Sequence, residues 1–103
     1  MHKVIFSMEA VAMVQSYIRR YRLYYEELYS DSGLWNEDMI IEGYQAEAIK
    51  RYEEIFDIVE VHLEKEIVSY KKDETIIKWR SRVLFVSFED DDNIRTVTHI
   101  QIR

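Results

Sequence analysis

The spacing of apolar residues along this chain changes near residue 66, from a helical period to an extended one. Over residues 8–30, apolar side chains recur at alternating steps of three and four, which places them on one stripe of a helix: Val11, Val14, Ile18, Tyr21, Tyr25 and Leu28. A second stripe with the same period runs from Ile41 to Leu63. We therefore predict helices over about residues 8–30 and 36–65 that pack together as a hairpin.

Local signals support the boundaries of both helices. Ser7 is a favourable N-cap residue, and Glu9 follows in the first turn, where the helix dipole favours a negative charge. The Asp31-Ser32-Gly33 cluster is typical of a helix end, and Asn36 can cap the second helix. The short apolar segment before Ser7 predicts a strand over about residues 2–6.

The last third of the chain has the composition of strands. Residues 67–70 and 75–88 are rich in Ile, Val, Phe and Trp, and the segment Glu89-Asp90-Asp91-Asp92-Asn93 predicts a turn. Side chains alternate between the two sides of a strand. One side of the last predicted strand would carry Ile94, Thr96, Thr98, Ile100 and Ile102, and the other side would carry Arg95, Val97, His99, Gln101 and Arg103. The predicted fold class is α+β, with an N-terminal strand, a two-helix hairpin and a mostly antiparallel C-terminal sheet in a single domain over residues 1–103.

Composition narrows the class of protein without identifying it. The chain has 103 residues, 48% of them hydrophobic, so it can bury one core and differs from chains that stay unfolded. It contains no cysteine, which excludes disulfides, thiolate metal sites and cysteine nucleophiles. No segment has the roughly 20 apolar residues of a membrane span, and the first apolar segment is too short for a signal-peptide core. We expect a cytoplasmic protein with no membrane partner.

The net charge of −6 is concentrated in the second predicted helix. Residues 36–66 carry ten acidic and three basic side chains, whereas the regions on either side are nearly neutral. Nucleic acid repels an acidic protein unless its basic groups gather on one face. Lys78, Arg80 and Arg82 are candidates for such a group, because they occupy alternate positions with no acid between Thr75 and Phe88.

On an extended strand these three cations share one face, where they could bind phosphates or stabilise charge at a scissile phosphate. The alternative is structural: charges on an edge strand discourage aggregation, or pair with acids of the second helix. The segment Tyr17–Tyr25 interleaves aromatic and basic residues, as in some sites for single-stranded nucleic acid. Its aromatic residues fall mainly on the buried stripe, which favours a packing role.

The sequence indicates no metal or cofactor chemistry. His2, His62 and His99 lack the spacing of a metal site, and the acids at 90–92 lack the pattern of a calcium loop. The chain has no motif of a catalytic triad, a phosphate-binding loop or a dinucleotide site. We therefore expect neither a cofactor nor a bound metal.

Three segments together resemble a known family. Lys3-Val4-Ile5-Phe6-Ser7 precedes Glu9-Ala10 at a helix start, a helical hairpin follows, and Arg82-Val83-Leu84-Phe85-Val86 leads across the acidic turn into residues 94–102. In element order, nearly the whole chain is similar to the RelE/ParE superfamily of toxins from bacterial type II toxin–antitoxin systems. Members typically show Ser-x-x-Ala at the first helix, an Arg-Val-Leu-Tyr-like strand before the last hairpin, and a β-α-α-β-β-β order.

The resemblance implies two alternative activities. RelE-like members cleave mRNA in the ribosome with basic residues of the sheet, and the corresponding phosphate-binding and charge-stabilising residues would be Lys78, Arg80, Arg82 and Arg103. ParE-like members inhibit DNA gyrase and are not nucleases. The family's usual glycine before the arginine strand is replaced by Trp79-Arg80-Ser81, and the chain is acidic. Both departures favour a ParE-like or diverged member.

The resemblance also implies partners: a cognate antitoxin, and DNA gyrase or the ribosome with its mRNA. A homodimer stays open, as does whether the chain is an enzyme. A different class also fits the composition, namely a non-catalytic acidic interaction module such as an antitoxin or an immunity protein. The neighbouring gene separates the two classes, because a small DNA-binding antitoxin gene favours the first and a large toxin gene favours the second.

Overall fold

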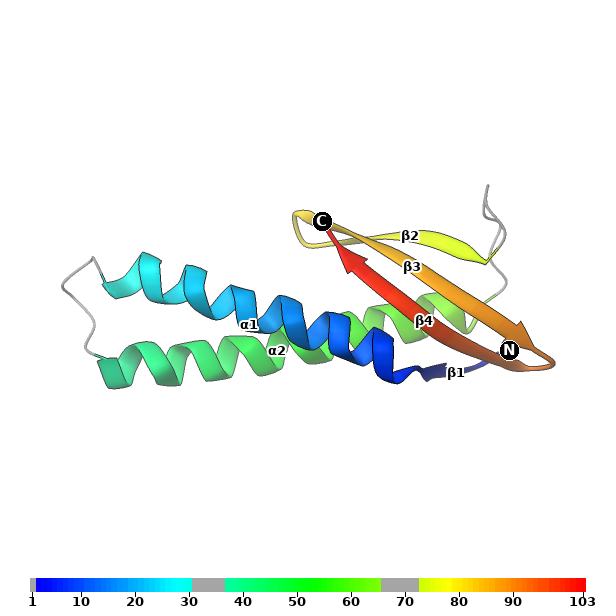
Figure 1. The fold of residues 1–103 in the computed structure, drawn as a ribbon, viewed down its shortest axis with the longest axis horizontal. Coiled ribbons are helices and arrows are strands. Elements are labelled where there is room, and N and C mark those ends of the chain that lie inside the picture. Colours follow the sequence, from blue (N-terminus) through cyan, green and yellow to red (C-terminus); the bar gives the residue numbers. More distant parts are fainter. Residues whose placement is uncertain (1, 31–36, 66–72) are drawn as a thin grey trace.

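The part of the chain that the structure describes, residues 2–30, 37–65 and 73–103, folds into two long helices and a four-stranded sheet (Figure 1). The structure is a computed structural model. In chain order the elements are β1 (Lys3–Phe6), α1 (Met8–Ser30), α2 (Glu37–Leu63), β2 (Glu74–Trp79), β3 (Arg82–Asp91) and β4 (Ile94–Ile102). The predicted α+β class is confirmed, and both helices lie where the apolar spacing predicts them.

The sheet has the strand order β1-β4-β3-β2. β2, β3 and β4 are antiparallel neighbours, whereas β1 pairs with β4 in parallel. The N-terminal strand therefore lies beside the C-terminal one, and the helical hairpin carries the chain from one edge of the sheet towards the other. Both helices pack against the same face of the sheet (Figure 1).

Ser7 links β1 to α1 and explains where the helix begins. Its Oγ accepts a hydrogen bond from the backbone N–H of Ala10 at 3.1 Å and donates one to the carbonyl oxygen of Thr98 at 3.2 Å. The first bond satisfies an N–H group that has no partner within the first helical turn. The second attaches the helix start to β4, so this side chain fixes both the helix boundary and its position on the sheet.

The hydrophobic core lies between the helices and the sheet. It combines one stripe from each helix with alternate residues of the strands: Ala10, Val14, Tyr17, Ile55, Val59, Leu63, Ile77, Trp79, Leu84, Val86, Phe88, Val97 and Ile100. Burial of a large apolar side chain stabilises a fold by roughly 1.5–3 kcal/mol. The helix–sheet interface is therefore the main source of stability, and it fixes which face of the sheet points away from the helices.

The helical hairpin extends beyond the sheet, so helix–helix contacts hold its outer half (Figure 1). The molecule is accordingly elongated, at 54 × 21 × 19 Å. The interior of this half is aromatic: the ring centroids of Tyr21 and Tyr25 lie 6.0 Å apart, and each lies 6.4 Å from that of Tyr44. The Tyr44 hydroxyl donates to the carbonyl oxygen of Ile18 at 3.4 Å. These contacts support a packing role, and not base stacking, for Tyr21 and Tyr25 of α1.

The predicted alternation along β4 is wrong. Arg95 and Val97 are buried on the helix side together with Ile100, although alternation placed them on the opposite side from Ile100. The cause is a β-bulge, because the register between β3 and β4 slips by one residue at Thr98. An extra residue in one strand shifts every following side chain to the other face, and the alternation of residue types gives no sign of it.

The acidic turn is present but shorter than predicted, because Glu89, Asp90 and Asp91 belong to β3 and pair with β4, which leaves Asp92 and Asn93 between the strands. β3 ends at Asp91, β4 begins at Ile94, and Asp92 takes a left-handed backbone with φ 52°, which Asp adopts more readily than most residues. Three other predictions lie outside the described residues: the helix-ending cluster at 31–33, the cap at Asn36 and the strand over residues 67–70.

Candidate functional site on the open face of the sheet

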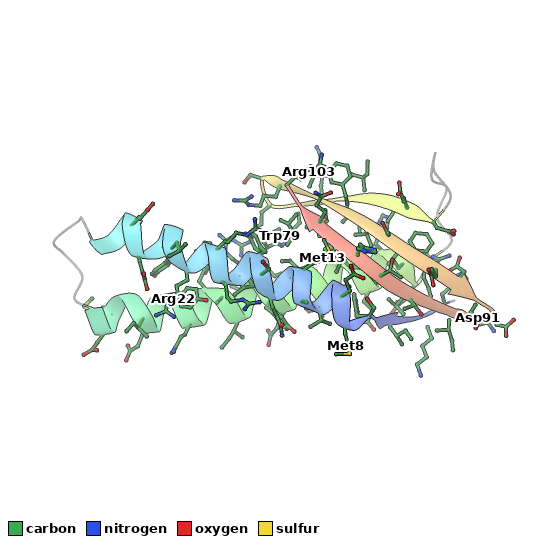
Figure 2. All side chains as sticks on the ribbon, in the orientation of Figure 1. Met8, Met13, Arg22, Trp79, Asp91 and Arg103 are labelled. Carbon is green, nitrogen blue, oxygen red and sulfur yellow. The ribbon has the colours of Figure 1, made fainter. Side chains whose placement is uncertain are left out.

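The face of the sheet that points away from the helices is the candidate functional site, and we call it the open face. Side chains alternate across a sheet, so the residues between the buried core positions of β2, β3 and β4 point to this face: Ile76, Lys78, Val83, Phe85, Ser87, His99, Gln101 and Arg103. Figure 2 shows Arg103 on the side of the sheet that faces away from the helices, and Trp79 on the side that faces them. The open face therefore combines apolar, polar and basic groups.

Lys78 and Arg103 are the two predicted site residues that lie on the open face. Lys78 pairs with Val83 across β2 and β3, and Val83 exchanges two backbone hydrogen bonds of 2.9 Å with Arg103. The three residues form one row across the sheet. The Arg103 guanidinium lies over the Phe85 ring, 4.8 Å from its centroid. Two cations therefore occupy one end of the open face.

Arg80 lies in the turn between β2 and β3 and is directed towards α2. Its backbone has φ 53°, the left-handed conformation that two-residue hairpin turns require. Its guanidinium forms an ion pair with Glu54 at 2.7 Å and lies 3.5 Å from Glu47. The hydrogen bond from Arg80 holds the pKa of the Glu54 carboxyl below its usual value. Arg80 is therefore paired with acids of the second helix, as the structural interpretation predicted.

Arg82 lies on the helix side of the sheet, opposite Trp79 in the β2–β3 pairing. Its guanidinium carbon is 5.4 Å from the centroid of the Tyr17 ring of α1. Burial raises the pKa of the neighbouring Tyr21 phenol. A small hollow of about 190 Å³ lies here, lined by Tyr17, Arg20, Tyr21, Arg82 and Ile102. Arg82 thus belongs to the contact between α1 and the sheet.

The prediction that Lys78, Arg80 and Arg82 share one face is wrong. A period of two keeps side chains on one face only while the chain stays extended, and here one strand ends at Trp79 and the next begins at Arg82. A two-residue turn places its flanking residues opposite each other on the same face, so Arg82 follows Trp79 to the helix side. Lys78 stays on the open face with Arg103. The four basic residues therefore form no common phosphate site.

A shallow hollow of about 360 Å³ lies on the open face. Its lining joins apolar residues to two hydroxyl residues, a carboxylate, an imidazole and an amide, and α1 contributes one residue at its border: Met13, Glu74, Thr75, Ile76, Phe85, Val86, Ser87, His99 and Gln101. A concave surface that combines apolar and polar residues can contact both kinds of group on a ligand or a segment of polypeptide. The hollow and the two cations lie on the same face of the sheet.

Glu9, His99 and Thr98 form a hydrogen-bonded chain at the border of the open face. His99 Nε2 lies 3.0 Å from Glu9 Oε1, and His99 Nδ1 lies 3.2 Å from Thr98 Oγ1. A carboxylate, an imidazole and a hydroxyl in this order are the groups of a catalytic triad. The His99 and Glu9 side chains are 48% and 67% exposed, so water competes for both bonds and the chain serves to attach α1 to β4. The sequence holds no signal for it, because Glu9 and His99 are 90 residues apart.

Arg95 is a buried cation that joins distant parts of the chain. Its Nε donates to Asp90 at 2.7 Å, and its Nη1 donates to the carbonyl oxygens of Leu63 and Lys65 at 2.9 and 3.0 Å. Its Nη2 lies 3.3 Å from Nε2 of His2. The hydrogen bond from Arg95 holds the pKa of the Asp90 carboxyl below its usual value. Because its donors bind within the protein, Arg95 has a structural role.

Within residues 2–30, 37–65 and 73–103, no three His, Asp or Glu side chains gather as the ligands of a metal ion would. Over the same ranges, neither helix has the length and apolar character that crossing a membrane requires. Comparisons with protein-family models, with curated proteins and with solved structures gave no match. The geometry and charge of the open face are therefore the basis for a functional proposal.

Proposed function

We propose that this protein is a toxin-like component of a bacterial toxin–antitoxin system, and that it acts by binding a protein target without cleaving RNA. The toxin-like part of the proposal rests on the resemblance in element order and motifs, and the observation that carries the second part, binding without cleavage, is the separation of the four basic residues over two faces of the sheet. Phosphoryl-transfer catalysis needs preorganised positive groups around one developing charge. Lys78 and Arg103 point to one face, whereas Arg80 and Arg82 are directed to the helix side.

Electrostatics supports the same proposal. Arg80 is paired with two carboxylates of α2, and the whole chain carries a net charge of −6. Attraction between exposed charges is largely screened beyond about 8 Å at physiological salt. A few dispersed cations beside an acidic helix therefore give RNA little net attraction. A protein target does not require a concentrated positive surface.

The open face is the surface that we assign to the protein partner. Its hollow offers Ile76 and Phe85 for apolar contact, with polar groups at the border, and Lys78 and Arg103 can hold a carboxylate at one end. An extended partner segment fits such a surface, because alternate side chains can enter the hollow while the others face solvent. A cognate antitoxin would supply the segment, DNA gyrase is the target that the family resemblance suggests, and both would be met in the cytoplasm.

Inducible expression in a bacterial host tests the proposal. We expect growth arrest on induction and relief when the neighbouring gene is expressed as well. Arg82→Ala should keep this toxicity, whereas Lys78→Glu should reduce it, because Lys78 lies on the open face and Arg82 lies on the helix side of the sheet. Circular dichroism of both purified variants controls for loss of fold.

Ribosome-dependent cleavage of a translated mRNA is the decisive second measurement. The purified wild type should leave the mRNA intact. Robust cleavage by the wild type that Arg82→Ala abolishes would overturn the proposal and assign the protein to the nuclease branch.

The acidic, exposed side of α2 favours a second candidate function, that of a non-catalytic interaction module such as an antitoxin or an immunity protein. Glu53, Asp57 and Glu60 are exposed on this helix. In the same expression experiment, this candidate predicts no growth arrest by the chain itself. It predicts instead that the chain protects the host from the toxic product of a neighbouring gene.

A further inference from the structure

We propose that the helical hairpin carries a second docking surface, which binds a basic amphipathic helix of a partner protein. The surface is the side of the hairpin that faces away from the sheet, and we call it the far side. It uses other residues than the open face and does not depend on the toxin-like function.

The two sides of α2 have different surroundings. On the sheet side, Arg51 donates to the Tyr17 hydroxyl at 3.2 Å and Glu54 pairs with Arg80. Ile49 lies on the opposite side, because two residues of a helix correspond to about 200° of rotation. From Ile49 a stripe continues along the helix in both directions at steps of three and four: Ile41, Gln45, Ile49, Tyr52 and Phe56.

Apart from Gln45, the stripe is apolar, and it is only partly covered. Ile49 is 61% exposed, while Tyr52 and Phe56 are half-buried with ring centroids 4.7 Å apart. Phe6 of β1 closes one end through an edge-to-face contact with Phe56 at 4.8 Å. An exposed aliphatic side chain beside two half-buried rings is typical of the apolar centre of a protein interface.

A hollow beside the stripe gives the far side its shape. It has a volume of about 310 Å³ and is lined by Gln15, Ile18 and Arg19 of α1 and Tyr52 of α2. Side chains of one helix pack into grooves of another, so a hollow between two helices accepts the apolar ridge of a third. None of the four described strands lies beside the outer half of the hairpin, which leaves room for a helix to approach (Figure 1).

Charge selects the kind of helix. Glu42, Glu53 and Glu60 are exposed and flank the stripe on α2, since at about 100° per residue they fall on one side of the helix. An incoming helix with lysine or arginine beside its apolar face meets opposite charges there, whereas an acidic helix is repelled. Arg19, at the hollow on the α1 side, restricts the basic side of the partner to α2. The partner chemistry is therefore a helix with an apolar stripe and one basic flank.

A synthetic helix tests the proposal against the full chain. The probe is a fluorescein-labelled peptide of leucine, alanine and lysine, about five helical turns long, with its leucines on one face. A second peptide has the same composition in shuffled order. Fluorescence anisotropy at about 0.15 M salt measures both affinities. We expect the amphipathic peptide to bind at least about tenfold more tightly than the shuffled one.

Ile49→Glu and Leu23→Glu form a matched pair of variants. Leu23 lies on α1, on the opposite side of that helix from Val14 and the core, and is 63% exposed, close to the 61% of Ile49. Both changes replace an exposed aliphatic side chain by the same acid. Ile49→Glu should weaken peptide binding at least about tenfold, and Leu23→Glu should leave it within about twofold. Circular dichroism checks that both variants keep the fold.

Several results would overturn the proposal. If attraction were purely electrostatic, both variants would bind the basic peptide as well as the wild type or better, because each adds a negative charge. Equal binding of the two peptides, or no binding by the wild type, also contradicts it. Sedimentation of the wild type tests a different occupant: a dimer that Ile49→Glu dissociates would assign the far side to a second copy of the chain.

Discussion

We expect the substitution Arg95→Met to destabilise the protein by about 3 kcal/mol. Arg95 is 5% exposed and lies where β4, the end of β3 and the end of α2 meet. Methionine keeps an unbranched side chain that can still contact the Phe88 ring, which the guanidinium now covers at 4.7 Å. The substitution therefore separates the contribution of the hydrogen bonds from that of packing.

The magnitude follows from the bonds that are lost. Nε and Nη2 bind both carboxylate oxygens of Asp90, at 2.7 and 3.1 Å, and a hydrogen bond to a charged group contributes about 1.5–3 kcal/mol. The Asp90 side chain is 37% exposed, so water replaces part of this contribution. The carbonyl oxygen of Leu63 also loses its donor, and a buried acceptor without a partner costs about 1–3 kcal/mol. Together these losses place the effect at the lower end of the range for broken buried ion pairs.

Urea unfolding followed by circular dichroism measures the change. For slopes of about 1–3 kcal/mol per molar urea, the expected loss moves the midpoint by about 1–3 M. Arg80→Met is the matched control, because Arg80 also contacts two carboxylates but its side chain is 33% exposed. An exposed ion pair contributes about 0–1 kcal/mol. If the two substitutions cost the same, burial is not what makes Arg95 important, and the reasoning is refuted.

Three further outcomes are expected. Ser7→Ala should lower the free energy of unfolding by about 1 kcal/mol, because the N-cap hydrogen bond is lost. Ser7→Thr should keep most of the stabilisation that this hydrogen bond contributes, and urea midpoints measure both changes. Burial, reinforced by the charge of Lys65, lowers the pKa of His62, so the unfolded chain binds the proton more readily. The free energy of unfolding should therefore fall as the pH decreases through 6.5 towards the pKa of His62 in the folded protein. The urea midpoints of His62→Gln, measured over the same pH range, should lack this part of the pH dependence. The lowered pKa of Asp90 contributes stability above pH 3.8 that is lost as the pH falls further, so Asp90→Asn should be costly near neutrality and almost without effect in strong acid.

The helices were predictable because the signals that fix them are local. Apolar spacing and a capping side chain act within one or two turns, and Ser7 bonds Ala10 inside the first turn of α1. The bond from Ser7 to Thr98 joins opposite ends of the chain, and no local pattern encodes it. The parallel pairing of β1 with β4 is a long-range contact of the same kind. The strand order is therefore not readable from the spacing of residue types.

The candidate site was less predictable, because a turn without a recognisable signature divides it. Two-residue hairpin turns usually contain glycine or asparagine, which accept left-handed backbone angles, but here Arg80 and Ser81 form the turn and Arg80 has φ 53°. For most residues this conformation costs about 1–2 kcal/mol. The ion pair between Arg80 and Glu54 is made from this conformation and offsets part of the cost. The charge of the second helix predicted that basic residues would pair with it. The composition did not predict that the chain turns at Arg80 and Ser81.

The division of acids between the two sides of α2 connects both proposals. On the sheet side, Glu47 pairs with Arg51 at 3.2 Å and Glu54 pairs with Arg80, so these charges are neutralised within the chain. On the far side, Glu53 stays exposed beside the apolar stripe. The net charge of the helix does not distinguish acids that pair within the chain from acids that stay exposed. The rotation of about 100° per residue decides on which side of the helix each acid lies. The exposed acids weaken attraction to RNA and favour a basic helix, so poor RNA binding and selective binding of such a helix are two consequences of one charge distribution.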